Sequence, residues 1–205
     1  MSTAMPRPSV LLLDVMGTLV HDPFYVEIPR FFGMSLRELL AVKHPHAWVE
    51  FELDAIDEPT LLARFFADGR PVDGEGLRAA VRRAYRFLPG IEPLLQALVA
   101  RGVAMHALSN YPRWYELIED RLELSRYLQW SFVSCHTGVR KPDPAAYRHA
   151  ARTLGVEPSA CLFVDDREDN CAAAREQGMD AVRFTDASSL HDALAERGLL
   201  AAAPQ

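Results

Sequence analysis

Residues Val10–Val20 read VLLLDVMGTLV, and this stretch decides the fold class of the chain. Four apolar residues lead directly into Asp14, and a small turn at Met16-Gly17-Thr18 follows. A continuous apolar run bounded by turn residues predicts a strand that is buried on both faces, as in a parallel sheet. A carboxylate at the carboxyl end of such a strand faces the crevice where open α/β sheets bind ligands. An aspartate in this position also caps turns, so a ligand site and a simple turn both fit the stretch alone.

The composition is that of a soluble globular protein. The chain has 205 residues, of which 49% are hydrophobic and 24% charged, enough for one core with or without a small accessory domain. The net charge is −6 and no basic block is present, which argues against nucleic acid as a partner. Cys135, Cys161 and Cys171 lack the spacing of a metal site, so we expect buried, reduced thiols.

No targeting segment is recognisable in the sequence. The first eight residues, MSTAMPRP, lack the apolar centre of a signal peptide. No apolar run approaches the length that spans a membrane, so we expect no membrane partner and a cytoplasmic location. No oligomeric state is predicted.

The region 21–89 shows helical patterns and no strand pattern, so we expect a small helical unit inserted after the first strand. A capping box and an acidic first turn with an early proline mark two helix starts. The expected segments are a helix from Ser35 through Val42, an apolar segment near Trp48, a helix start at Asp57-Glu58-Pro59 and a helix over Leu77–Phe87.

From residue 90 onward, strands and helices alternate strictly. Four helices end at a glycine, namely Gly102, Gly155, Gly178 and Gly198, as helices with left-handed caps do. The expected strands are VAMHALS, WSFVS, ACLFVDD and MDAVRF. Alternation of this kind predicts an α/β fold with a parallel sheet and right-handed crossovers, built from residues 9–20 and 90–200.

Three further polar clusters follow predicted strands, so all of them are expected at the same edge of the sheet as Asp14. Ser109-Asn110 offers a hydroxyl and backbone N–H groups to an anion, although a helix cap fits as well. Lys141, between Arg140 and Pro142, is suited to a phosphate, although loop cations are usually solvated. The adjacent carboxylates Asp165-Asp166 end a buried strand and need a cation. Hard oxygen ligands of this kind suit Mg²⁺.

The four clusters in this order resemble the haloacid dehalogenase (HAD) superfamily of hydrolases over nearly the whole chain. Its motifs correspond to DVMGT, LSN, RKPDP and FVDDREDN. The resemblance implies a Rossmann-like parallel sheet with strand order 5-4-1-2-3 and a helical cap formed by the insertion at 21–89. It also implies a phosphatase that acts on a small phosphorylated metabolite.

The resemblance carries residue roles with it. Asp14 corresponds to the nucleophile that forms an aspartyl-phosphate, which is covalent catalysis by a carboxylate. The expected Mg²⁺ ligands are Asp14, the backbone carbonyl of Met16 and Asp166, with Asp165 assisting directly or through water. The phosphoryl oxygens are expected to contact Ser109, Asn110 and Lys141, and Lys141 also to offset the charge on Asp14.

Residue 16 departs from the pattern of the phosphatases. They usually carry a second aspartate there as general acid and base, and the thioether of Met16 cannot transfer a proton. A cap residue is one substitute, and Lys43, His44 and His46 are the candidates as acid or substrate contact. A second explanation is that the leaving group needs little protonation, so that no acid is required. A third explanation is that the chain is a weak enzyme or an inactive module that binds a phosphate ligand. A further alternative is a metal-independent 2-haloacid dehalogenase.

A narrower resemblance points to the substrate. The segments DPFY, FFGMS, KHP, EFE, DGR and SNYPRWY are similar to those of the plant plastid flavin mononucleotide (FMN) hydrolases. This resemblance implies FMN or another phosphate ester with a large planar group. Candidate stacking residues are Trp48, Phe51, Tyr111, Trp114 and Tyr115, although aromatic residues at these spacings also build cores.

Overall fold

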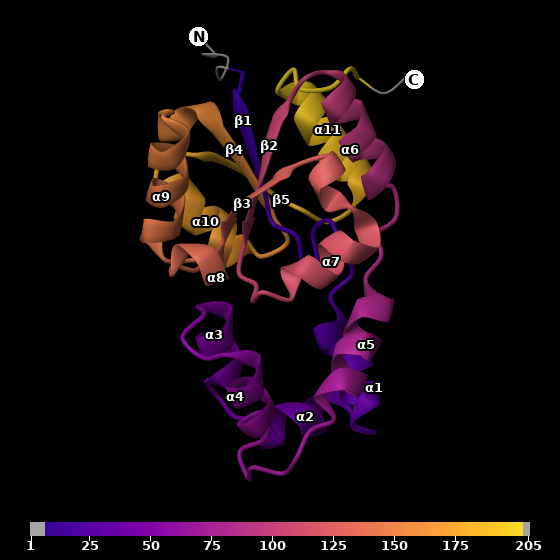
Figure 1. Cartoon of the computed structure of the whole chain (residues 1–205). Helices are drawn as coiled ribbons and strands as arrows, with labels where there is room; N and C mark the ends of the chain where they lie inside the picture. The colour runs from indigo at the N-terminus through magenta and orange to yellow at the C-terminus, as the bar shows by residue number, and fades with distance from the viewer. Residues whose placement is uncertain (1–6, 203–205) are drawn as a thin grey trace.

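A five-stranded parallel sheet forms the centre of the chain in the computed structural model, which describes residues 7–202 (Figure 1). The strands are β1 (Val10–Leu13), β2 (Ala104–Ser109), β3 (Gln129–Val133), β4 (Cys161–Asp165) and β5 (Asp180–Arg183). Their order is β3-β2-β1-β4-β5, which is the predicted order 5-4-1-2-3 read from the opposite edge. The predicted α/β class and strand order are therefore confirmed.

Helices cover both faces of this sheet, because side chains of a strand alternate between its faces. Leu11 and Leu13 belong to one buried cluster, and Val10 and Leu12 to the other. The first cluster includes buried residues of α6 (Ile91–Ala100), α7 (Tyr115–Leu122) and α11 (Ala187–Glu196). The second includes buried residues of α9 (Pro144–Leu154) and α10 (Glu168–Glu176).

The helices of the core largely follow the sequence prediction. The four glycines expected at helix ends have positive φ angles between 67° and 84°. Helix α7 begins at Tyr115, three residues after the predicted start at Pro112. Short helical turns not singled out in the sequence are α8 (Ser134–Thr137), η2 (Leu124–Arg126) and η3 (Pro158–Ala160).

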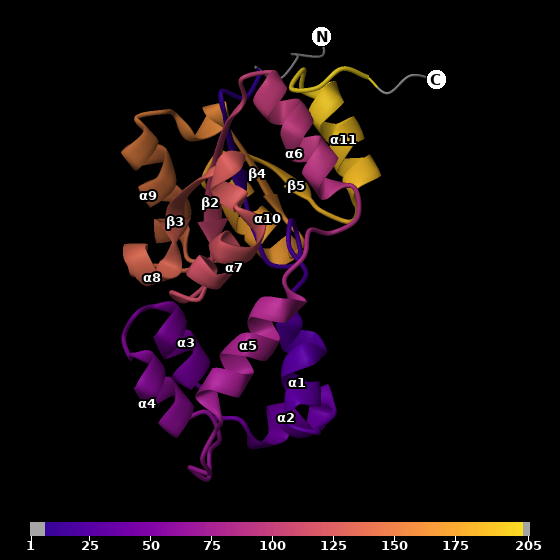
Figure 2. The same ribbon diagram turned by 45° about the vertical axis from the view of Figure 1, so that its right-hand side comes forward.

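The region 21–89 contains helices, as predicted, and they lie beyond the carboxyl ends of the strands (Figure 2). They are η1 (Pro23–Tyr25), α1 (Glu27–Phe31), α2 (Leu36–Val42), α3 (Ala47–Glu52), α4 (Glu58–Ala63) and α5 (Gly74–Ala84). Both capping predictions hold, since Ser35 and Glu38 form a complete capping box and Asp57 caps α4. The division into a core and a cap at 21–89 stays a prediction.

Two helices of this region differ from the prediction. Helix α1 was not expected, because its five residues are too few to show a helical period. Helix α5 was expected over Leu77–Phe87, but it begins at Gly74 because the Asp73 side chain accepts the Gly76 N–H.

The sequence also led to expectations about the cysteines and about membrane-spanning segments. The three cysteines are buried free thiols, as expected. No helix among the described residues is both long and apolar enough to cross a membrane. The segment MSTAMPRP lies outside the described residues except for its last two positions.

Candidate active site

Three carboxylates converge where β1 and β4 end. Asp14 follows β1, Asp165 is the last residue of β4, and Asp166 follows it. One oxygen of each lies within 4.8 Å of the others. The parallel register between Leu13 and Val164 places the two strand ends side by side, so the sequence-predicted convergence of these residues is observed.

The buried Lys141 pairs with two of these carboxylates. Its Nζ lies 2.7 Å from Asp14 Oδ1 and 2.6 Å from Asp165 Oδ2, and its side chain is 2% exposed. Burial raises the pKa of Asp14 to about 7, although the nearby ammonium opposes this shift. Burial by itself would lower the pKa of Lys141, but the two carboxylates together raise it above its ordinary value. The lysine therefore keeps its charge although its side chain is buried.

The carboxylate of Asp165 is fully engaged by protein donors. Asn170 Nδ2 lies 3.0 Å from both of its oxygens, and the Arg167 N–H donates to Oδ1 at 2.9 Å. Lys141 contacts the remaining side of Oδ2. Asp165 therefore holds the lysine in place, and Asn170, within the predicted motif but given no role, fixes Asp165.

Asp166 is held differently, because its carboxylate has no hydrogen-bond donor among the described residues and lines the pocket. Burial and the neighbouring Asp165 raise its pKa. Its close approach to the first turn requires glycine at position 17. Gly17 has φ +78°, and a Cβ there would lie 2.9 Å from Asp166 Oδ2.

Thr18 joins the two aspartates, a role that sequence reasoning missed. Its hydroxyl donates to Asp14 Oδ2 at 3.0 Å and accepts the Asp166 N–H at 3.1 Å. Thr18 is fully buried, so this hydroxyl has no water to replace either partner. The signal was present in the quoted motif, because Thr18 follows Asp14 by four residues across a glycine turn.

The donor set fits a hard divalent cation. Asp14 and Asp166 offer carboxylate oxygens, and no backbone N–H of the described residues donates to the Met16 carbonyl. All-oxygen donor sets with one or two carboxylates are typical of Mg²⁺ sites. The residues present therefore fit the metal that the sequence suggested.

Ser109 and Asn110 differ in how they meet this site. Ser109 Oγ is buried at the end of β2 and has no hydrogen-bond partner among the described residues. Such an unpaired polar atom is costly and is typical of a ligand site. The Asn110 side chain instead pairs with the main chain of Lys141, accepting its N–H at 2.7 Å and donating to its carbonyl at 2.8 Å. Its side chain thus positions the lysine, whereas sequence reasoning assigned Asn110 to phosphate.

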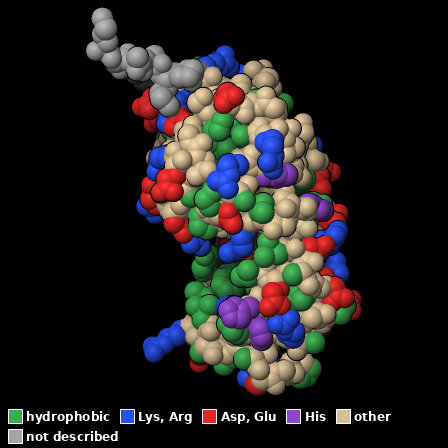
Figure 3. All heavy atoms as spheres, turned by 90° about the vertical axis from the view of Figure 1, so that its left-hand side faces the viewer, with side chains coloured by type: hydrophobic (Ala, Val, Ile, Leu, Met, Phe, Trp, Pro, Cys, Tyr) green, Lys and Arg blue, Asp and Glu red, His purple; other side chains and the backbone are tan. Residues whose placement is uncertain are grey.

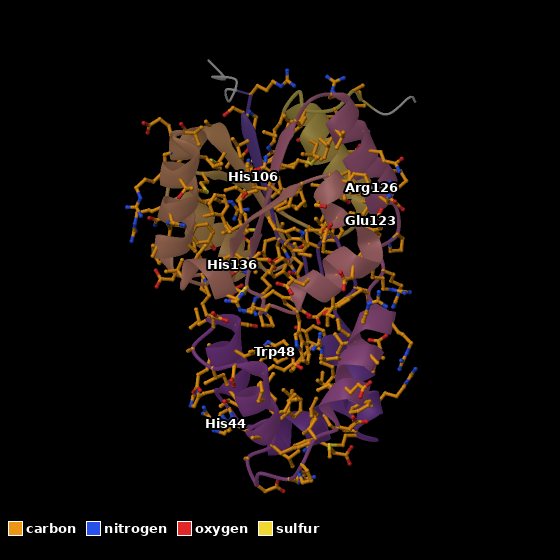
Figure 4. The ribbon with its side chains drawn as sticks, viewed as in Figure 1. His44, Trp48, His106, Glu123, Arg126 and His136 are labelled. Atoms are coloured by element: carbon orange, nitrogen blue, oxygen red, sulfur yellow. The ribbon has the colours of Figure 1, made fainter. Side chains whose placement is uncertain are left out.

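The helical region closes the pocket from the other side. Figure 3 shows a hollow between the two parts of the molecule with hydrophobic side chains inside it. Its lining from the helical region includes Asp22, Phe24, Trp48 and Glu52. Trp48 belongs to α3 and lies on the inner side of that helix (Figure 4). Burial raises the pKa of Glu52, which nevertheless accepts from the Arg140 guanidinium at 2.8 Å and from Trp48 Nε1 at 2.6 Å.

The candidate cap residues Lys43, His44 and His46 are not among the residues that line this pocket, so we do not propose them as its acid or substrate contacts. His44 lies on the outer part of the helical region (Figure 4), and its Nδ1 accepts the N–H groups of His46 and Ala47 at 3.2 and 3.0 Å. Its imidazole therefore accepts hydrogen bonds from N–H groups at the start of α3 that have no partner within the helix.

The candidate stacking residues divide between pocket and core. Trp48 and Tyr111 line the pocket. Phe51 and Trp114 are buried in the core, with ring centroids 5.7 Å apart. Tyr115 packs against Trp130 with centroids 4.9 Å apart. Sequence reasoning missed Phe24 and Tyr25, which line the pocket from η1 and lie within the quoted segment DPFY.

Comparison with known proteins identifies the family of this chain. The model of the haloacid dehalogenase-like hydrolases matches residues 9–178. The chain is 48% identical over 196 residues to chloroplast flavin mononucleotide hydrolase 1 of Arabidopsis thaliana, covering 96% of this chain and 80% of that protein. It is 33% identical over 200 residues to phosphoglycolate phosphatase 1 of Pseudomonas aeruginosa, covering 90% of this chain and 71% of that protein.

A solved structure shares the fold. It is a HAD family enzyme of Bacteroides thetaiotaomicron in complex with magnesium and inorganic phosphate, 19% identical, with a TM-score of 0.71. The match covers 89% of this chain and 98% of that one. The family match, the relatives and the shared fold confirm the resemblance in the sequence: this chain is an enzyme of the haloacid dehalogenase-like hydrolase family.

Proposed function

We propose that this enzyme is a Mg²⁺-dependent phosphatase that hydrolyses a small phosphate monoester through an aspartyl-phosphate on Asp14. The observation that carries the proposal is Lys141, whose buried ammonium contacts both Asp14 and Asp165. An anionic nucleophile attacks an anionic phosphate only when cations screen both, and positioning then supplies most of the rate. The cluster provides one such cation within the protein itself.

Each residue at the strand ends then has one task. Asp14 attacks phosphorus, and Thr18 orients it through the hydrogen bond to Oδ2. Ser109 Oγ, which lacks a partner among the described residues, donates to a phosphoryl oxygen. Lys141 contacts the same phosphoryl group, and its main chain is held for this purpose by Asn110.

Mg²⁺ would be held by Asp14, the Met16 carbonyl and Asp166, and it would supply positive charge to the phosphoryl oxygens. The carboxylate of Asp165 is engaged by Lys141, Arg167 and Asn170, so it acts on the metal site through the lysine or through water.

We further propose FMN as the substrate class, because the relative that is 48% identical is named for that activity. The pocket supports a planar group, since Phe24, Tyr25, Trp48 and Tyr111 line it beside the carboxylates. Aromatic faces of this kind bind a flat ring system through stacked or edge contacts. A cytoplasmic location, as expected from the sequence, stays a prediction and is tested by fractionation of cells that express the chain.

The test is a panel of FMN, phosphoglycolate, sugar phosphates and p-nitrophenyl phosphate, assayed for released phosphate with Mg²⁺ and with chelator. The expected result is turnover that requires Mg²⁺ and is fastest with FMN. Asp14→Asn should abolish turnover of every ester, and Asp57→Asn, which alters an exposed helix cap far from the pocket, should not. Unchanged hydrolysis by Asp14→Asn would refute the aspartyl-phosphate.

Met16 favours one alternative, a phosphate-ligand binding module without turnover. That alternative predicts that FMN binds, for example in a fluorescence titration, while no phosphate is released. Dehalogenation of 2-haloacids is not proposed, because three carboxylates within 4.8 Å of one another favour a cation site. Chloride release in the presence of chelator would reverse this choice.

A further inference from the structure

Asp22 is an acidic side chain that the pocket contains but that the proposed mechanism leaves unused. It lines the same pocket as Asp14, Met16 and Lys141. After Asp14 the chain turns at Gly17, and this turn brings Val20 back beside Met16. Gly17 N–H donates to the Val20 carbonyl at 2.8 Å, and Val20 bridges to Met16. Asp22 follows Val20 by two residues, so it comes back beside the turn that carries Met16.

The carboxyl group of Asp22 is only half satisfied. Oδ1 accepts the Phe24 N–H at 2.9 Å, and Oδ2 has no hydrogen-bond donor among the described residues. No arginine or lysine of those residues pairs with it. Glu52, the other acidic side chain of the helical region in the pocket, is instead held by Arg140 and Trp48. Asp22 is therefore the pocket carboxyl from this region that is free to bind and release a proton.

The burial of Asp22 favours its protonated form. Burial raises its pKa, and the nearby carboxylates act in the same direction. The Phe24 N–H and a protonated His21 oppose this rise in the pKa, and His21 Nε2 lies 2.9 Å from Glu27 Oε2. The titratable groups that influence Asp22 or are influenced by it are His21, Tyr25, Glu27, Glu52, Tyr85, Tyr111 and Asp166. The pocket that Asp22 lines also contains the charged residues Asp14, Arg140, Lys141, Asp165 and Arg167.

We propose that Asp22 is the general acid and base of the reaction, in place of the side chain at residue 16. This inference rests on the proposed phosphatase function. The thioether of Met16 has no proton to give, and an alkoxide leaving group needs one. Asp22 supplies the missing proton from a neighbouring place on the same turn, so the enzyme loses the residue of the family pattern without losing the chemistry.

The proton balance closes over two half-reactions. In the first, Asp14 Oδ forms a bond to phosphorus, the ester P–O bond breaks, and the Asp22 carboxyl proton goes to the leaving oxygen. In the second, the Asp22 carboxylate takes a proton from water as that water attacks phosphorus. The bond between phosphorus and Asp14 then breaks, which releases inorganic phosphate and returns Asp22 to its protonated form.

The test is Asp22→Asn, because asparagine keeps the cap to Phe24 and removes only the proton transfer. With FMN, the single-turnover release of riboflavin should fall by about 10²–10⁴-fold. p-Nitrophenolate leaves without protonation, so its first release should stay within about threefold of wild type. The variant should then show a burst equal to the enzyme concentration followed by slow turnover, since the base for the second step is missing.

Two further variants make the result specific. Asp57→Asn changes another capping aspartate, which accepts the Thr60 N–H at 2.9 Å outside the pocket, and should keep both rates. Met16→Asp in the Asp22→Asn background should restore turnover of FMN by at least about tenfold, because it returns an acid to the usual place. Thermal unfolding of each variant shows whether the fold is kept.

Three results would overturn the assignment. Turnover of FMN by Asp22→Asn at close to the wild-type rate would exclude proton transfer by Asp22. If the rate of p-nitrophenolate release and the rate of riboflavin release fell by the same factor, Asp22 would have a structural role instead. A wild-type chain that hydrolyses no ester would refute the phosphatase function itself, and the role of Asp22 with it.

Discussion

Replacing Lys141 with methionine is expected to destabilise the fold as well as the site, because this lysine is the only cation among the described residues in contact with Asp14 and Asp165. Its side chain is 2% exposed, and those of its partners are 9% and 0% exposed. Methionine has a similar length and fills the same space, so the change removes charge with little loss of packing. Two buried carboxylates then face each other without a counter-ion.

The expected loss is about 3–5 kcal/mol in the free energy of unfolding, the usual cost of removing one partner from a buried ion pair. This is a large share of the roughly 5–15 kcal/mol that stabilises a typical domain. The loss should be greater at pH 8 than at pH 5.5. Burial raises the pKa of Asp14 to about 7 even beside the lysine, so below that pH this carboxyl is neutral in both proteins. Above that pH, Asp14 is ionised and paired with Lys141 in the wild type. The variant must either keep Asp14 protonated or bury an unpaired charge, and both reduce its stability.

Urea unfolding followed by tryptophan fluorescence, in chelator and at the two pH values, measures this difference. Lys43→Met is the matched control, since Lys43 is the other lysine of the chain and lies at the partly exposed end of α2. That control should change stability by no more than about 0.5 kcal/mol. A loss below about 1 kcal/mol for Lys141→Met at pH 8 would refute the reasoning, because it would mean that the carboxylates do not depend on the lysine.

Three further substitutions test single contacts. Gly17→Ala should lower activity and cost at least about 1 kcal/mol in urea unfolding, because φ is +78° and the new Cβ would lie 2.9 Å from Asp166 Oδ2. Thr18→Val should cost about 1–3 kcal/mol, and Thr18→Ser much less, because only serine keeps the hydroxyl between Asp14 and Asp166; equal losses would contradict this. Asp54→Asn, which breaks the exposed ion pair with Arg113 at 2.8 Å, should change thermal stability by less than about 1 kcal/mol, and a larger loss would show that this pair holds the helical region to the core.

The sheet could be predicted from sequence because short strand patterns alternate with helices, and a polar cluster follows four of the five strands. Parallel strands bring their carboxyl ends to one edge, so four clusters far apart in the chain had to meet there. The contacts within the meeting place were less predictable. Asn110 follows a strand as an anion-binding residue does, but its side chain pairs with the Lys141 main chain. That pairing depends on how two loops approach each other, which no local pattern encodes.

The helical region shows the same limit more clearly. Its capping signals at Ser35 and Asp57 are local, and both were predicted correctly. The histidines near α3 looked suited to acid catalysis, yet His44 Nδ1 is occupied by backbone N–H groups outside the pocket. Asp22 was overlooked because an aspartate before proline reads as a cap, and it is indeed one through Oδ1. Only the return of the chain through the bridge between Met16 and Val20 brings it to the site.

These contacts divide the pocket into two halves with different tasks. At the strand ends, Lys141, Asp165 and Asn170 are joined by an ion pair and by hydrogen bonds within the protein. On the helical side, Asp22 has one oxygen without a partner, and the aromatic rings of Phe24 and Trp48 line the pocket. Under the proposed function, phosphoryl transfer depends on the strand-end residues, whereas the leaving group would contact residues of the helical region. Changes in the helical side should alter which ester is cleaved, and changes at the strand ends should alter whether any ester is cleaved at all.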